Sequence, residues 1–128
     1  PSTSETWIEV SRTHAFALGV EPPLEVGELP AGAVTIRGPK GEIAVARNVI
    51  VEARHLEVTR DEALRWGLHA GLVVSAEIDG PRAVLFKNVK VRVLDAAKDS
   101  FEGCLELDRD EANAAMVGPG DRARILVE

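Results

Sequence analysis

The same short pattern of apolar and polar residues occurs three times along the chain, at intervals of about 48 residues. Each copy reads apolar, Glu, apolar, then Ser, Thr or Asp, then Arg, and the copies lie at 8–12, 56–60 and 105–109. Such alternation is typical of a strand that turns its apolar residues to one face and its Glu to the other. The pattern therefore predicts a fold built on an internal repeat of about 48 residues.

Each copy leads into a segment that we expect to form a helix of about two turns. Ser11, Thr59 and Asp108 are favourable N-cap residues. In the second and third copies a Glu follows three residues later, which completes a capping box. The helices are expected at 13–18, 61–66 and 110–116, with Gly19, Gly67 and Gly118 marking their ends.

The rest of the chain has mainly strand patterns, separated by turn residues. We expect strands at 33–37, 42–46, 48–54, 73–78, 83–86, 88–93 and 121–127, with a hairpin turn at 38–41. Many short strands of this kind indicate a barrel or a sandwich. We therefore expect a mainly β fold of small β-barrels with short capping α-helices. An incomplete first β-barrel unit would occupy 1–54, and a second β-barrel domain would occupy 55–128.

Composition excludes several classes of function. The formal net charge of the chain is −6, and no basic patch suited to nucleic acid is evident. No apolar run approaches the ~20 residues that a membrane-spanning helix needs. The only cysteine, Cys104, has no partner within the chain for a disulfide, which indicates a reducing compartment and a cytoplasmic location. We interpret Cys104 as a small apolar strand residue.

Three glutamates, Glu9, Glu57 and Glu106, occupy the same place in the three copies. If they converge, their carboxylates would need a metal ion, an arginine or shared protons. His55 lies two residues before Glu57, so the two share a strand face and could form half of a site for zinc or another divalent metal. The alternative is a set of solvent-facing side chains on separate strand edges.

Four arginines are candidates for binding phosphate or coenzyme A. Arg12, Arg60 and Arg109 lie at expected helix N-termini, and Arg54 lies just before the second copy. Positive side chains next to helix N–H groups favour anions. The alternative is pairing with surface Asp or Glu, which contributes little stability.

The sequence also resembles a known family along essentially its whole length. The matching stretches are 8–23 (IEVSRTHAFALGVEPP), 36–43 (IRGPKGEI), 49–59 (VIVEARHLEVT), 84–93 (VLFKNVKVRV) and 107–115 (LDRDEANAA). They resemble the phosphate propanoyltransferase (PduL-type phosphotransacylase) family. The resemblance implies two β-barrel domains with a two-metal zinc site between them. It also implies acyl transfer between coenzyme A and phosphate, with coenzyme A as the family substrate.

The resemblance assigns roles to single positions. Glu9 matches the metal-binding glutamate of the family, and His55 matches the first histidine of its second His-x-His pair. Glu57 and Glu106 stand where the family has histidines. The first His-x-His pair has no counterpart here, and no arginine stands near Thr3, where the family has its phosphate-binding arginine. Three carboxylates and one imidazole suit harder ions than zinc.

The resemblance therefore leaves three hypotheses open. The chain is a degenerate family member that keeps the fold, or an acyltransferase that is completed by self-association or by a separate partner chain. The third hypothesis is a carboxylate-rich module that binds a divalent metal. We also predict a homodimer, because the strands at 33–37 and 48–54 would have an open edge that needs covering.

Overall fold

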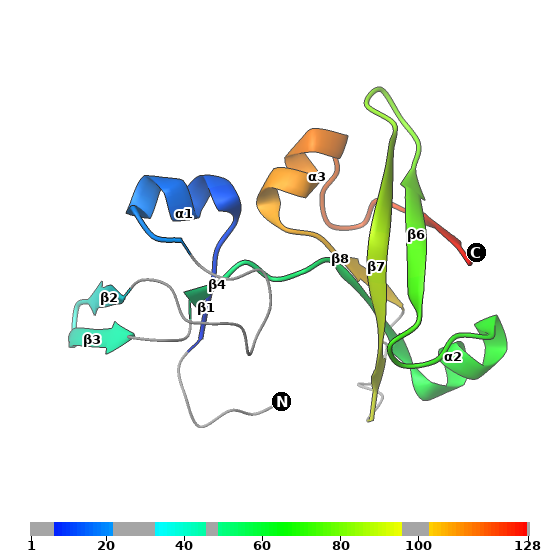
Figure 1. The fold of residues 1–128 in the computed structure, drawn as a ribbon, viewed down its shortest axis with the longest axis horizontal. Coiled ribbons are helices and arrows are strands. Elements are labelled where there is room, and N and C mark those ends of the chain that lie inside the picture. Colours follow the sequence, from blue (N-terminus) through cyan, green and yellow to red (C-terminus); the bar gives the residue numbers. More distant parts are fainter. Residues whose placement is uncertain (1–6, 22–32, 46–48, 96–102, 128) are drawn as a thin grey trace. The chain divides into compact units, whose positions relative to one another are not determined.

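The computed structural model describes residues 7–21, 33–45, 49–95 and 103–127. The chain divides into two compact units, Pro1–Ala53 and Arg54–Glu128, which are described separately below (Figure 1). The division falls next to the predicted boundary at residue 54, and the barrel character of each unit stays a prediction. The fold is mainly β with a few short helices. No helix in the described ranges is long and apolar enough to cross a membrane.

The described residues of the first unit form two small two-stranded sheets and one helix. Strand β1 (Ile8–Glu9) pairs in parallel with β4 (Val49–Ile50), and β2 (Val34–Gly38) forms a hairpin with β3 (Gly41–Val45). The hairpin agrees with the predicted turn at 38–41. Helix α1 (Arg12–Leu18) follows β1 directly.

The strand predicted at 48–54 is much shorter in the structure, where only Val49–Ile50 is a strand. Residue 48 lies outside the described residues. The pairing stops because β1 is itself short. The Val10 N–H donates to the Ile50 carbonyl at 2.9 Å, and the chain then turns at Ser11 into α1. Residues after Ile50 therefore have no β1 residue with which to pair, and β4 ends there.

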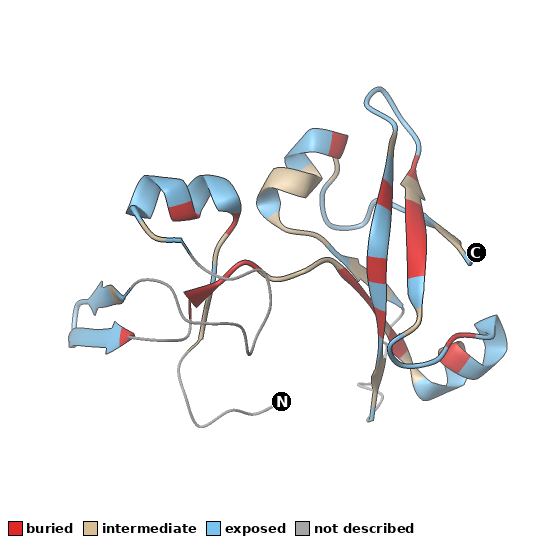
Figure 2. Cartoon of the chain, in the orientation of Figure 1, coloured by how far each residue is buried: buried red, intermediate tan, exposed pale blue. Residues whose placement is uncertain are grey.

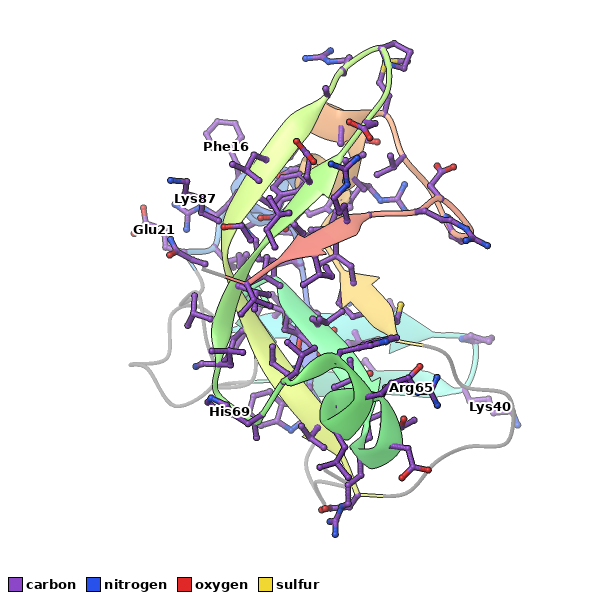
Figure 3. All side chains as sticks on the ribbon, turned by 90° about the vertical axis from the view of Figure 1, so that its right-hand side faces the viewer. Phe16, Glu21, Lys40, Arg65, His69 and Lys87 are labelled. Carbon is purple, nitrogen blue, oxygen red and sulfur yellow. The ribbon has the colours of Figure 1, made fainter. Side chains whose placement is uncertain are left out.

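In the second unit, the part of the chain that the structure describes forms a five-stranded sheet in the order β8-β5-β7-β6-β9. Its strands are β5 (His55–Thr59), β6 (Val73–Ile78), β7 (Val84–Leu94), β8 (Cys104–Glu106) and β9 (Arg124–Leu126). β5 and β7 are parallel, whereas the β5–β8, β6–β7 and β6–β9 pairs are antiparallel. The sheet curls into a half-barrel (Figure 3).

Strand β7 is continuous where the sequence predicted two strands, at 83–86 and 88–93. Asn88 has a φ of 58°, and the register between β6 and β7 shifts between Val74 and Ala76. Asparagine tolerates this left-handed conformation better than most residues do. The irregularity is therefore absorbed as a β-bulge within one strand and does not become a turn.

The three strand-to-helix turns have the capping expected from the sequence. Ser11, Thr59 and Asp108 each accept a backbone N–H from the residue three positions on, and both predicted capping boxes are present. The helices are α1, α2 (Arg60–Trp66) and α3 (Arg109–Ala115). The same local structure thus occurs three times, while its origin in an internal repeat stays a prediction.

The end predicted for the third helix, at Gly118, is wrong. Helix α3 ends at Ala115, and Met116 takes the left-handed position with a φ of 57°. Val117 then donates its N–H to the Ala112 carbonyl and packs against the core. A hydrophobic contact of this kind commonly accompanies a left-handed helix terminus, and here it determines the position at which the helix ends.

The core residues of the second unit alternate along β5 and β7, so the core lies on one face of the sheet. Figure 2 marks the buried residues of these strands in red. Val58, Val89 and Val91 are almost completely buried, as is Ala76. On β5 the buried apolar residues are Leu56 and Val58, so alternation turns His55 and Glu57 to the opposite face. The core thus determines which side chains are available for a polar site.

Candidate site on the polar face of the second unit

Three neighbouring strands place polar side chains on the face of the sheet that lies opposite the core. Across β5 and β7, His55 is opposite Lys90 and Glu57 is opposite Arg92. Across β5 and β8, the partners of His55 and Glu57 are Glu106 and Cys104. We call this group the polar face; it comprises His55, Glu57, Lys90, Arg92, Cys104 and Glu106.

His55 lies in the centre of the polar face and is only 2% exposed. Its Nε2 atom is 2.9 Å from Nη1 of Arg92 and 3.5 Å from Oε1 of Glu57. A guanidinium can only donate hydrogen bonds, so Nε2 accepts from Arg92 and the ring proton lies on Nδ1. The Glu57 oxygen is beyond ordinary hydrogen-bond distance and acts on this pair mainly through its charge.

Cys104 and Glu106 form the β8 side of the polar face. The Cys104 thiol donates to Oε1 of Glu106, with 3.2 Å between the two atoms. Burial, this hydrogen bond and the charges of Glu106 and Glu57 raise the pKa of the Cys104 thiol to about 11. At neutral pH the thiol is therefore protonated and weakly nucleophilic. Cys104 is a strand residue as expected, but its neighbours on the polar face are the carboxylates of Glu57 and Glu106.

Two of the three predicted glutamates are on this face. Glu57 and Glu106 lie on adjacent strands and both act on Cys104. Glu9 belongs to β1 in the other unit, so the convergence of all three stays a prediction. In the described ranges, no three or more His, Cys, Asp or Glu side chains are grouped to hold a metal ion. Because Nε2 of His55 accepts from Arg92, the polar face in this arrangement does not fit a metal ion.

A family model for phosphate propanoyltransferase matches residues 1–118 of the chain. The chain belongs to the phosphate propanoyltransferase family. A phosphate propanoyltransferase of Thermotoga maritima is 35% identical over 129 residues, which cover 98% of this chain and 60% of that protein. One of Lachnoclostridium phytofermentans is 34% identical over 128 residues, with 98% and 58% covered. One of Rhodopseudomonas palustris is 36% identical over 127 residues, with 98% and 54% covered. The chain thus spans little more than half the length of these relatives.

Among the arginines predicted for phosphate or coenzyme A in this family member, Arg54 has the most partners in the structure. Its Nε atom is 2.7 Å from Oε1 of Glu111, and its Nη1 donates to the Lys87 carbonyl at 3.0 Å. The guanidinium also lies over the Phe86 ring, 5.3 Å from the centroid. Arg54 therefore ties the start of β5 to α3 and to the bulged part of β7.

The other three arginines are exposed. Arg60 pairs with Asp95 at 3.2 Å, and both side chains are mostly in solvent. Arg12 and Arg109 are exposed in the first turns of α1 and α3. Phosphate or coenzyme A binding by any of the four arginines stays a prediction.

Sequence reasoning missed Arg92 and Lys90 as members of the polar face. The signal was present, because Val89, Val91 and Val93 alternate with Lys90 and Arg92 along β7. Alternation alone shows that these two side chains share a face, opposite the core. Only the parallel register of β5 and β7 shows that this is the face of His55.

Proposed function

We propose that the chain serves the reaction of its family, acyl transfer between coenzyme A and phosphate, as an altered member that does not catalyse the transfer on its own. Membership of the family supports the reaction class. The observation that supports the alteration is the pair of carboxylates, Glu57 and Glu106, that flank His55 where the resemblance puts histidines.

The charge and the ligand type of Glu57 and Glu106 both support the alteration. Carboxylates are hard oxygen ligands, whereas zinc favours nitrogen and sulfur. Glu57 and Glu106 therefore differ in both charge and ligand type from the histidines that the resemblance puts at these positions. The chain would then keep the family fold as a binding or assembly module. We propose no zinc or other divalent metal ion bound by the polar face alone, because the Arg92 N–H is directed at Nε2 of His55.

An assay of the purified chain tests this proposal. Acetyl-CoA, phosphate and zinc are mixed with the protein, and release of the coenzyme A thiol is followed with a thiol reagent. We expect release no faster than in the matched mixture without protein. Sustained turnover that disappears in His55→Ala would overturn the proposal, because it would show a competent centre that depends on this histidine.

A second candidate function, an acyltransferase completed by association, is favoured by the β2–β3 hairpin. Its paired residues Ile36 and Ile43 are 42% and 49% exposed, so the hairpin has an apolar surface in solvent. Apolar surface on a short two-stranded sheet favours pairing with another chain. We propose a homodimer joined through this hairpin, with a separate partner chain as the alternative occupant.

Sedimentation velocity at micromolar concentration tests the association. We expect a dimer for the wild type and a monomer for Ile36→Lys combined with Ile43→Lys. A matched variant, Leu85→Lys, changes an exposed apolar residue of the other unit and should leave the dimer intact. A monomeric wild type would refute the homodimer.

A repeated unit offers a common explanation for the three strand-to-helix turns, and we propose it as the origin of the fold. The support is that Ser11, Thr59 and Asp108 cap helices of the same length directly after a strand. Its consequence for function is that Glu9, Glu57 and Glu106 would be equivalent positions.

A further inference from the structure

The formal charges of the polar face are balanced within the chain itself. Lys90 and Arg92 contribute two positive side chains from β7, and Glu57 and Glu106 contribute two negative ones from β5 and β8. The His55 ring, which accepts a hydrogen bond at Nε2, adds no charge in that state. The two carboxylates beside His55 therefore have cationic neighbours on the same sheet.

The position of Arg92 matters more than its charge alone. Its Nη1 atom is 2.9 Å from Nε2 of His55, on the lone pair through which a ring protonated at Nδ1 would bind a metal ion. Oε1 of Glu57 is 3.5 Å from the same nitrogen. A divalent ion bound between His55 and Glu57 would have to displace the Arg92 N–H and remain next to its positive charge, which is unfavourable.

We propose that Arg92 is the resident cation of the polar face and that its guanidinium excludes divalent metal from His55 and Glu57. Arg92 is thus a positioning residue. It fixes the His55 ring in the form with the proton on Nδ1, and its charge lies opposite Glu57, its partner across β5 and β7, in place of a metal ion. The exclusion of metal by Arg92 is independent of the proposed function, because it concerns which ion binds at His55. It does not depend on whether the chain catalyses acyl transfer.

The first test compares zinc binding by three proteins. The wild type, Arg92→Gln and Arg82→Gln are titrated with zinc by calorimetry, and zinc retained after dialysis is measured by mass spectrometry. Arg82 is exposed on the turn between β6 and β7, so its substitution makes the same change of charge away from His55. We expect at least a tenfold gain in zinc affinity for Arg92→Gln only. An unchanged affinity in folded Arg92→Gln would overturn the proposal.

The second test uses the wild type, so it does not depend on the folding of a variant. Long-range proton–nitrogen spectra of protein with labelled histidine report which ring nitrogen carries the proton, and His55→Gln assigns the signals. We expect the His55 ring to be protonated at Nδ1 and unaffected by one equivalent of zinc. Stoichiometric zinc binding at Nε2 of wild-type His55 would overturn the proposal.

A gain-of-site variant provides a further arm. Arg92→Gln combined with Glu57→His and Glu106→His replaces the resident cation and gives the face three imidazoles. We expect this variant to retain one zinc ion per chain, whereas Glu57→His with Glu106→His in the presence of Arg92 retains much less. Equal zinc retention by the two variants would count against exclusion by Arg92.

Discussion

Replacing Arg54 with Met should destabilise the second unit substantially, because Arg54 joins three parts of it. The ion pair with Glu111 is partly buried, with side-chain exposures of 33% and 18%. A pair in this intermediate setting is worth about 2 kcal/mol, between the small value of surface pairs and the larger one of fully buried pairs. The contact with the Phe86 ring adds about 0.5 kcal/mol, since methionine keeps only part of it. We therefore expect a loss of about 2.5 kcal/mol in the free energy of unfolding.

Urea denaturation followed by circular dichroism measures this loss, and Arg60→Met is the matched control. Arg60 also forms an ion pair with an Asp, but the exposures of Arg60 and Asp95 are 71% and 97%. The control should change the free energy of unfolding by less than about 0.5 kcal/mol. A double-mutant cycle with Glu111→Gln isolates the pair, because Gln keeps an oxygen for the Asp108 N–H. Equal effects of Arg54→Met and Arg60→Met would refute the argument.

The same pair predicts how the loss depends on pH. Burial raises the pKa of Glu111 above its ordinary value of 4.5, although the Asp108 N–H and Arg54 oppose this shift. Without Arg54 the pKa should rise further. A raised folded-state pKa means that stability is lost as pH increases through it. The deficit of Arg54→Met should therefore be smaller at pH 5 than at pH 8. If the loss in the free energy of unfolding caused by Arg54→Met grows towards acid pH, the charge of Glu111 is not the cause of that loss.

Three other predictions concern single contacts. Gly103→Ala should cost about 1 kcal/mol and change tryptophan fluorescence, because a Cβ would lie 2.9 Å from the Trp66 ring; unchanged fluorescence and stability would contradict this. Thr59→Ala should lower the free energy of unfolding by about 1 kcal/mol in urea titrations, because it removes the N-cap of α2, whereas Thr59→Ser should be nearly neutral. Alkylation of Cys104 by iodoacetamide should be slow at neutral pH and accelerate towards pH 11, and Glu106→Gln should make it faster by lowering the thiol pKa.

Local features of the fold were predictable where one short segment contains all the information. Thr59 and Glu62 form a capping box within four residues, so the start of α2 is evident from the sequence. The end of α3 depends instead on where Val117 meets the core, which makes Met116 the left-handed residue in place of a glycine. The extent of β4 depends on the length of β1, a partner about forty residues away in the sequence.

The sequence predicts which side chains share a face of each strand, but it does not predict which side chains of different strands lie in contact. Alternation places His55 and Glu57 on one side of β5, and Lys90 and Arg92 on one side of β7. A shift of the β5–β7 register by one residue would put Arg92 on the core side relative to His55. The chemistry of His55 therefore depends on a parallel pairing that no local pattern encodes. For this reason a family resemblance could suggest a metal ligand at His55, while the sheet places the guanidinium of Arg92 on the nitrogen that would bind the metal.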